Sequence, residues 1–396
     1  MEPRKRTVFE MFTFALGLYA VQAFWGLNAS TLPLYFLEMT GSKSLTGLIL
    51  SSAGVFGAVV PVLAGGISDR VSTPWGRRKP FIVAGWLCAA VSLLALSRIS
   101  TPAAAVPVSL FLYAAFFTAI GPYFALMPDI TPKEQRGAAA GMMFLVGGMG
   151  ILSYLYLGAR TWDTSKTLPF IWGIALTVIP AGLMVAGTRE PRRAAGSPIT
   201  GRLFREALQN RPATAYLLAL VLAWTGLWMV SAFFVAAFRE MFNLTTDRAV
   251  MGFLIFTLVF IAGALPAGLI GERFGRKRVT AAGFLLLAGC LLLTGLIDGL
   301  MAAQILIGMS GIGYAVLLAV GYSYYLTLVP PERTAGYVGL YMACQNGTIL
   351  TGPAIAGVII ETWGYRWMFP CAGAFVLAGF LTFLVLSRGP RAGRAG

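Results

Sequence analysis

Long apolar stretches alternate with short polar segments along the whole chain. A helix that crosses a bilayer needs about 20 mostly apolar residues, and a backbone in lipid must satisfy its own hydrogen bonds. The pattern therefore predicts an all-α polytopic membrane protein with twelve transmembrane helices. The predicted spans are 11–36, 45–67, 80–97, 105–127, 138–158, 168–187, 213–237, 248–270, 279–297, 301–328, 336–360 and 367–387.

The composition supports this interpretation. Of the 396 residues, 58% are hydrophobic and only 11% are charged, whereas soluble domains carry about a quarter of charged residues. The first apolar stretch is longer than the signal-peptide core of about 7–15 residues, so we expect it to be retained as the first span. The four cysteines lie singly within apolar stretches and are expected to pack there without a disulfide or metal.

The basic residues indicate the topology. Of the 30 Lys and Arg, all but Arg248, the first residue of its span, fall outside the predicted spans, and an internal N-terminus places 23 of them inside and seven outside. This bias follows the positive-inside rule, so both termini are predicted to be cytoplasmic and the net charge of +15 needs no nucleic-acid partner. With its short loops and tails, the chain is expected in a prokaryotic plasma (inner) membrane, as a monomer whose partners are the lipid bilayer and a small-molecule solute.

The longest hydrophilic segment, 188–212, divides the spans six and six. We therefore predict an N-terminal six-helix bundle over 1–187 and a C-terminal one over 213–396. Apolar residues recur at helical spacing from 199 to 208, which favours a short helix at the membrane surface. A solvated basic linker is the open alternative for this segment.

Two short motifs recur between the halves. After the second and eighth spans the chain reads Gly-x-x-x-acid-Arg and then Gly-Arg-basic, with four extra residues in the first copy. A second anchor pairs Pro132 with Pro330, at an offset of 198 residues. Repeats of this length indicate a duplicated architecture. The motif residues are Gly65, Asp69, Arg70, Gly76 and Arg77 in the first copy, and Gly268, Glu272, Arg273, Gly275 and Arg276 in the second.

This pair of loop motifs resembles the signature of the major facilitator superfamily, and the resemblance covers the whole chain. It implies two pseudo-symmetric six-helix halves and secondary transport by alternating access. The first copy, with residues 69–82, also resembles the sucrose-type branch among the glycoside-pentoside-hexuronide transporters, as does the end of span four at 121–129. Plant sucrose symporters carry an Asp and an Arg within span four that are tied to proton coupling. Here Tyr113 and Phe124 stand at those places, so the likeness does not extend to proton coupling.

The resemblance further implies that the repeated loops form a cytoplasmic gate. Acids at helix ends beside arginines can cap helices and accept charge-assisted hydrogen bonds. The alternative is that these charges simply anchor helix ends at the headgroups. Gly65 and Gly268 would permit close helix approach. Besides the ten motif residues, the expected ionic partners are Asp129, Glu134, Arg136, Glu332 and Arg333.

The predicted spans carry no charge near their middle, and the chain has no His. Since a fixed charge on a solute normally meets a countercharge in the membrane, we predict a neutral solute. Amides, hydroxyls and aromatic faces are what a carbohydrate site requires, although the same side chains also join helices or lie at membrane interfaces. The candidate cavity residues are Gln22, Trp25, Asn28, Tyr113, Tyr123, Trp224, Trp228, Tyr314, Tyr322, Gln345 and Asn346.

These observations predict a secondary transporter for a neutral, hydroxyl-rich solute such as a sugar or glycoside, either a facilitator or a cation-coupled symporter. No cofactor is expected. A co-transported proton or sodium ion stays open, with Glu10, Glu38, Asp129, Asp298 and Glu361 as the acids that could serve it. The alternative is an exporter of apolar or amphipathic compounds, which 15 Met and 27 Phe would suit. An enzyme is not expected, because the sequence shows no nucleophile–base pair or metal-binding cluster.

Overall fold

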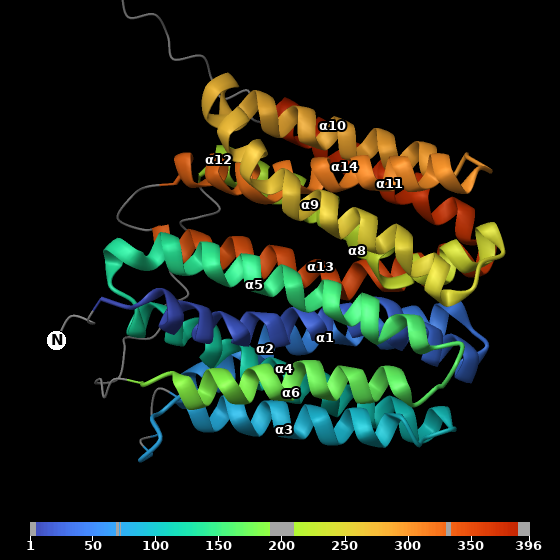
Figure 1. The fold of residues 1–396 in the computed structure, drawn as a ribbon. Helices are drawn as coiled ribbons and strands as arrows, with labels where there is room; N and C mark the ends of the chain where they lie inside the picture. Colours follow the sequence, from blue (N-terminus) through green and yellow to red (C-terminus); the bar gives the residue numbers. More distant parts are fainter. Residues whose placement is uncertain (1–4, 69–70, 72, 191–209, 330–333, 387–396) are drawn as a thin grey trace, which may run out of the picture. The chain divides into compact units, whose positions relative to one another are not determined.

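The computed structural model describes residues 5–68, 71, 73–190, 210–329 and 334–386, and these residues form helices joined by short loops (Figure 1). Within them, twelve helices are long and apolar enough to cross a membrane, so the predicted all-α fold is confirmed. The elements are α1 (Val8–Thr40), α2 (Lys43–Ser68), α3 (Lys79–Leu96), α4 (Pro102–Ile130), η1 (Lys133–Gln135), α5 (Arg136–Leu157), η2 (Ala159–Thr161), α6 (Leu168–Gly187), α8 (Arg211–Phe242), α9 (Thr246–Phe274), α10 (Arg276–Thr294), α11 (Leu300–Val316), η3 (Leu317–Gly321), α12 (Tyr322–Thr327), α13 (Thr334–Trp363) and α14 (Tyr365–Leu386).

Several helices extend beyond the predicted apolar stretches, because polar residues continue the helix past the hydrocarbon-length core. Helix α1 shows this at both ends. Thr7 accepts a hydrogen bond from the Glu10 backbone N–H (3.2 Å), and the Glu10 carboxylate accepts one from the Thr7 N–H (3.0 Å), forming a capping box. At the other end Gly41, with φ of +66°, closes the helix in the left-handed conformation.

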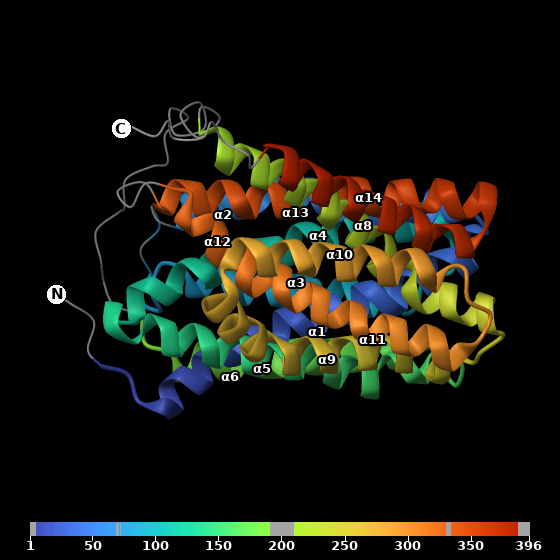
Figure 2. The same ribbon diagram turned by 90° about the horizontal axis from the view of Figure 1, so that it is seen from above.

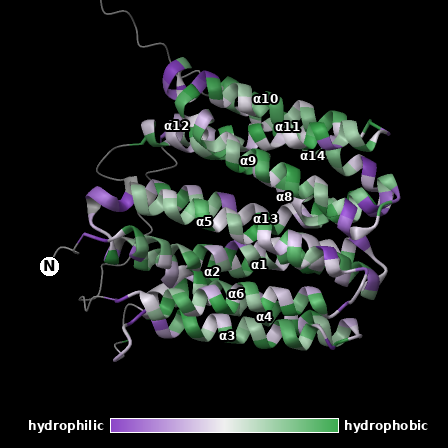
Figure 3. Ribbon diagram, viewed as in Figure 1, coloured by the Kyte–Doolittle hydropathy of each residue, from purple (hydrophilic) through white to green (hydrophobic). Residues whose placement is uncertain are grey.

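The chain divides into two compact units. The first comprises Met1–Pro198 together with Phe234–Arg239 and Leu244–Leu254, and the second comprises Ile199–Phe233, Glu240–Asn243 and Ile255–Gly396. The predicted linker helix at 199–208 lies outside the described residues. Within each unit the helices run roughly along one direction in both views (Figures 1 and 2). Apolar residues cover their lengths and hydrophilic residues gather at their ends (Figure 3).

In the first unit, α1 packs against α5 and α6, α3 against α4 and α6, and α2 against α4. In the second unit, α10 packs against α11 and α14, and α13 against α14. Glycines allow close approach in the first unit: a Cβ atom on Gly121 would lie 2.7 Å from the Pro61 carbonyl oxygen, and one on Gly85 would lie 2.7 Å from that of Ala115.

The close helix approach expected at Gly65 and Gly268 stays a prediction. No described atom of another element lies within 4 Å of a Cβ placed on either glycine. Close contacts within the first unit fall instead on Gly85 and Gly121, which lie outside the repeated loop motif.

Candidate functional site

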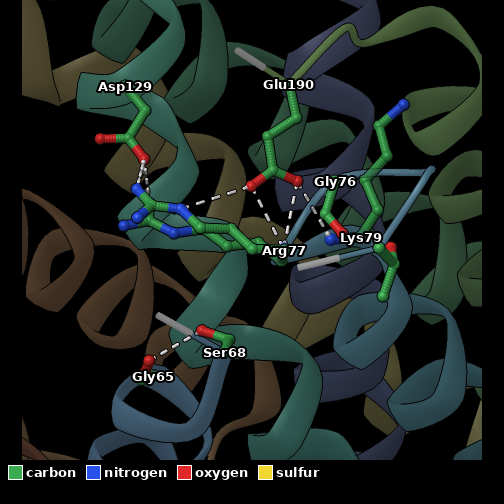
Figure 4. Close-up of polar contacts among 9 residues, drawn as sticks. Gly65, Ser68, Gly76, Arg77, Lys79, Asp129 and Glu190 are labelled. Atoms are coloured by element: carbon green, nitrogen blue, oxygen red, sulfur yellow. Dashed lines mark hydrogen bonds and ion pairs between the residues drawn. The ribbon is translucent and has the colours of Figure 1, made fainter. Parts of the chain in front are cut away.

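The loop between α2 and α3 carries an ion cluster that joins three segments of the first unit (Figure 4). We define this loop cluster as Arg77, Arg78, Asp129 and Glu190. The Asp129 carboxylate, at the end of α4, lies 2.9 Å from a guanidinium nitrogen of Arg77 and 2.9 Å from one of Arg78. The arginine side chains are 11% and 8% exposed, and that of Asp129 is 15% exposed. These are therefore largely desolvated charges whose pairing matters for stability.

Glu190, just after α6, completes the cluster from the other side. Its carboxylate lies 3.7 Å from Nε of Arg77, and its side chain is only 2% exposed. The backbone N–H groups of Arg78 and Lys79, at the start of α3, donate hydrogen bonds to it at 3.1–3.4 Å. Such a carboxylate satisfies N–H groups that a helix start leaves without partners and interacts favourably with the helix dipole.

Gly76 is required at the turn that brings these groups together. Its φ is +113°, a conformation that side-chain-bearing residues rarely adopt. A Cβ atom at this position would also lie 2.2 Å from a carboxylate oxygen of Glu190. The motif glycine therefore serves both the backbone turn and the approach of the Glu190 carboxylate.

A second set of contacts joins the N-terminal segment to the loop after α4. The Arg6 backbone N–H donates to the Gln135 side-chain carbonyl (2.7 Å), and the Gln135 amide donates back to the Arg6 carbonyl (3.1 Å). The Arg6 guanidinium donates to the carbonyl of Ile130 (2.8 Å) and lies 3.4 Å from Glu10. Glu10, a candidate protonation site, is thus engaged in a helix cap and an ion pair.

The structure brings together Arg77 and Asp129, which the sequence singled out as gate residue and ionic partner. It also shows Arg78, Glu190 and Gln135, which sequence reasoning missed. Glu134 is exposed, and Arg136 donates a hydrogen bond to the Thr131 carbonyl (3.4 Å). The remaining first-half candidates Asp69 and Arg70, and the second-half candidates Glu332 and Arg333, lie outside the described residues.

The second copy of the motif looks different. Glu272, Arg273 and Arg276 are exposed, and the Arg273 guanidinium lies 5.5 Å from the centroid of the Phe274 ring. Glu272 makes no ion pair among the described residues. Gly275 adopts φ of +91° immediately before α10, so the backbone turn is repeated although the ion cluster is not.

Five of the predicted cavity residues lie on α1 and α4 of the first unit. The Tyr113 hydroxyl donates to the Asn28 side-chain carbonyl (2.7 Å), and both side chains are buried. Trp25 is partly exposed and meets the aromatic rings of α4 edge-on. Tyr123 is buried, stacks on Phe14 and donates to its carbonyl (3.2 Å). Tyr123 therefore joins α1 to α4, while Trp25 retains exposed surface.

Gln22 is also partly exposed and lies close to α5, since a Cβ on Gly147 would contact it at 3.4 Å. In the second unit, Trp224 meets Tyr314 edge-on with ring centroids 5.2 Å apart, and Tyr322 meets Tyr341 at 5.0 Å. Of the candidate cavity residues in this unit, the partly exposed ones are Trp228, Tyr314, Tyr322, Gln345 and Asn346.

A further polar contact at the opposite end of the first unit was missed from the sequence. Asp163, in the loop before α6, accepts hydrogen bonds from the backbone N–H (2.5 Å) and hydroxyl (2.8 Å) of Thr246, the first residue of α9. Arg239 of α8 lies 3.6 Å from the same carboxylate. An isolated acid in a polar loop carries no sequence signal of such a partner 83 residues away.

The other proposed coupling acids also have partners. Glu38 accepts hydrogen bonds from Trp162 (3.0 Å) and Lys166 (2.7 Å). Asp298 pairs with Arg366 at 2.5 Å on the exposed surface. Glu38 lies at the end of α1 and Asp298 in the loop before α11, so neither acid is near the middle of a helix.

Comparisons with known proteins agree with the helical architecture. The chain is 24% identical over 393 residues to the uncharacterized MFS-type transporter STM4428 of Salmonella typhimurium, covering 96% of this chain and 97% of that protein. It is 30% identical over 145 residues to the inner membrane transport protein YnfM of Escherichia coli, of which this match spans 34%. A match to the sucrose transport protein SUT1 of Oryza sativa is 29% identical over 174 residues and covers 38% of this chain and 32% of that one.

Two solved structures share the fold. The nucleoside transporter NupG superposes with a TM-score of 0.77 at 16% identity, covering 95% of this chain and 99% of that one. An inward-facing bacterial homologue of the lysosomal transporter Spinster gives 0.75 at 15% identity, covering 96% of each chain. At this identity the likeness shows the fold and leaves the solute open.

The family assignment follows from the sequence match and the fold together. Residues 14–255 and 216–396 both match the profile of the Major Facilitator Superfamily. The described residues of the same segments contain twelve helices of membrane-spanning length. The chain belongs to the Major Facilitator Superfamily and is an integral membrane secondary transporter, not an enzyme.

Proposed function

We propose that this transporter moves a neutral, hydroxyl-rich solute, such as a sugar or glycoside, by alternating access. The observation that carries the proposal is the distribution of charge. In the twelve long helices of the described chain, every Asp, Glu, Lys and Arg lies within four residues of a helix end. A charged solute would normally require a countercharge deeper in the membrane, so a neutral solute fits these helices best.

The polar side chains that remain between the helix ends suit hydroxyl groups. Gln22 offers an amide donor and acceptor, and Trp25 offers an indole face, with partial exposure of both. Asn28 is held by the Tyr113 hydroxyl, which leaves the amide nitrogen of Asn28 as the donor of that pair. Partly exposed Trp228, Gln345 and Asn346 offer the same chemistry in the second unit. The partial match to SUT1, named a sucrose transport protein, supports a sugar as the first probe.

We further propose that the loop cluster is the cytoplasmic gate of the first half. It joins three segments through largely buried charges. The cluster can therefore stabilise one conformation of the transporter, and its ion pairs can break when another conformation is favoured. This role requires the residue 5–7 end of the first unit to lie in the cytoplasm, which is the orientation that the positive-inside rule predicts.

The test is uptake of labelled sucrose, maltose, glucose and uridine into proteoliposomes, with and without an inside-alkaline pH gradient. Uridine is included because the structural neighbour NupG is named a nucleoside transporter. We expect at least one of these neutral solutes to enter. Accumulation that needs the gradient would identify a proton symporter, and equilibration without it would identify a facilitator. Absence of uptake of all four solutes in both conditions would contradict the proposal.

Variants connect the result to the proposed residues. Gln22→Leu and Asn28→Leu should each reduce uptake by about 10-fold or more, as expected when a buried hydrogen-bonding group is lost from a polar site. Thr382→Val is the matched control, because Thr382 is partly exposed and its hydroxyl donates to the Ala378 carbonyl of its own helix. Uptake that is unchanged by the two leucine variants, together with efflux of an apolar dye, would favour the exporter instead.

A further inference from the structure

A groove opens at the end of the first unit beside the loop cluster. Its volume is about 460 Å³, and it lies between the loop before α3 and the end of α6. Two kinds of residue line it: apolar ones, and charged ones contributed by Lys79, Arg189 and Glu190. The complete lining is Pro74, Trp75, Lys79, Val185, Ala186, Arg189 and Glu190.

The charge available in this groove is positive. The Glu190 carboxylate faces Arg77 and the backbone N–H groups at the start of α3, and its side chain is only 2% exposed. Lys79 extends past Glu190, away from the pair of Arg77 and Asp129 (Figure 4). Neither Lys79 nor Arg189 makes an ion pair among the described residues. The groove therefore presents two cations beside one acid, and the Glu190 charge is shared among Arg77, the N–H groups at the start of α3 and Lys79.

Exposed apolar side chains lie in the groove and along the two helices that border it. Trp75 is 69% exposed at the groove, and tryptophan is enriched where a membrane meets water. Along the same two helices, Leu87 and Val91 of α3 and Leu183 of α6 are more than half exposed. A ligand with an anionic head and apolar chains would match both the cations and this surface.

We propose that the groove binds the phosphate headgroup of an anionic phospholipid. Lys79 and Arg189 contact the phosphate, Trp75 lies at the glycerol level, and the acyl chains follow the exposed apolar side chains of α3 and α6. Basic pockets beside transmembrane helices bind anionic headgroups by this combination of charge and apolar contact. The inference rests on the membrane fold and the groove, and it does not depend on which solute is carried.

The test is native mass spectrometry of the full-length protein in detergent, titrated with phosphatidylglycerol or with phosphatidylcholine of the same acyl chains. We expect phosphatidylglycerol to bind several-fold more tightly, and the Lys79→Gln, Arg189→Gln double variant to lose about five-fold or more of that affinity. Arg189→Gln alone, at an exposed residue, should lose part of it and guards against misfolding of the double variant.

The matched control is Lys277→Gln with Arg278→Gln, which removes one Lys and one Arg from the start of α10 in the second half. This control should retain phosphatidylglycerol binding within about two-fold. An equal loss in both double variants would overturn the proposal, because it would mean that general basic charge attracts the lipid. Displacement of the lipid by an equal concentration of glycerol phosphate would also overturn it, since a free anion would then suffice.

Discussion

The two copies of the repeated loop motif keep the same backbone turn but differ in their ionic contacts. Gly76 and Gly275 both adopt positive φ, Gly76 three residues before α3 and Gly275 immediately before α10. In the first copy Arg77 lies 11% exposed against two acids. In the second copy Glu272 and Arg276 are exposed, and Glu272 makes no ion pair among the described residues. The motif thus specifies a turn and a supply of cations, while other segments decide whether a cluster forms.

The missing partners can be read from the sequence once the first cluster is known. At the offset of 198 residues that pairs Pro132 with Pro330, Asp129 corresponds to Thr327. At the offset of 199, the segment 187–193 corresponds to 386–392, and Glu190 corresponds to Gly389. Both acids of the first cluster are therefore absent from the second half. We therefore expect the ionic contacts of the proposed gate to form mainly in the first half of the chain.

The largest effect is expected from Asp129→Ala. The substitution leaves Arg77 and Arg78 largely buried without their shared carboxylate, and removing one partner of a buried ion pair costs about 3–5 kcal/mol. The control is Glu272→Ala, an exposed acid of the second copy, whose effect should stay within about 0.5 kcal/mol. The measurement is unfolding of the purified proteins in detergent, followed by tryptophan fluorescence. Equal destabilisation by both variants would remove the proposed difference between the copies.

The next effect separates the turn from the cluster. Gly76→Ala and Gly275→Ala both place a side chain at positive φ, which costs about 1–3 kcal/mol at either site. Only at Gly76 does the new Cβ also collide with Glu190, at 2.2 Å.

Gly76→Ala should therefore destabilise the protein by about 1.5–3 kcal/mol more than Gly275→Ala, as expected when hydrogen bonds to a charged group are disturbed. The same unfolding measurement compares the two variants. A larger cost at Gly275 would show that the turn of the second copy is the more constrained one.

The sequence alone predicted the fold and part of this cluster. Twelve apolar stretches and a repeat across half the chain are long signals, and α1 to α14 follow them closely. The pairing of Arg77 with Asp129 was also accessible, because both lie at helix ends next to the repeated loops. Glu190 was not, since it stands among arginines in a segment whose net charge is basic and its partners lie 111–112 residues away.

The candidate cavity residues show the same limit. The long apolar stretches place Asn28 and Tyr113 on predicted helices, but only the packing of those helices shows that the two side chains are hydrogen-bonded to each other. The sequence likewise did not single out Gly85, which contacts a neighbouring helix, whereas it singled out Gly65, for which no described atom lies within 4 Å of a Cβ placed there. A motif identifies positions under constraint, whereas tertiary contacts decide what the constraint is.

A smaller effect should follow from Glu190→Gln. Glutamine keeps an oxygen that can accept from the Arg78 and Lys79 N–H groups but loses the charge that faces Arg77. We expect a loss of about 1.5–3 kcal/mol, the range for a hydrogen bond to a charged group, measured again by unfolding. Glu190→Ala is the comparison, and it should cost more because the N–H groups then lose their acceptor. If glutamine and alanine are equally destabilising, the charge alone matters and the helix cap does not.

The smallest effect comes from giving the second half an acid that it lacks. Thr327→Asp places a carboxylate at the position equivalent to Asp129, on an exposed residue of α12, and α12 packs against the α10 helix that Arg276 begins. Because the arginines there are exposed, a new pair should stabilise by at most about 1 kcal/mol. Salt should remove the gain, since exposed charges are screened at about 1 M ionic strength. A larger, salt-resistant stabilisation would mean that the arginines of the second copy are already positioned to pair with an acid. The difference between the halves would then come from the two positions, Thr327 and Gly389, where the second half lacks an acid.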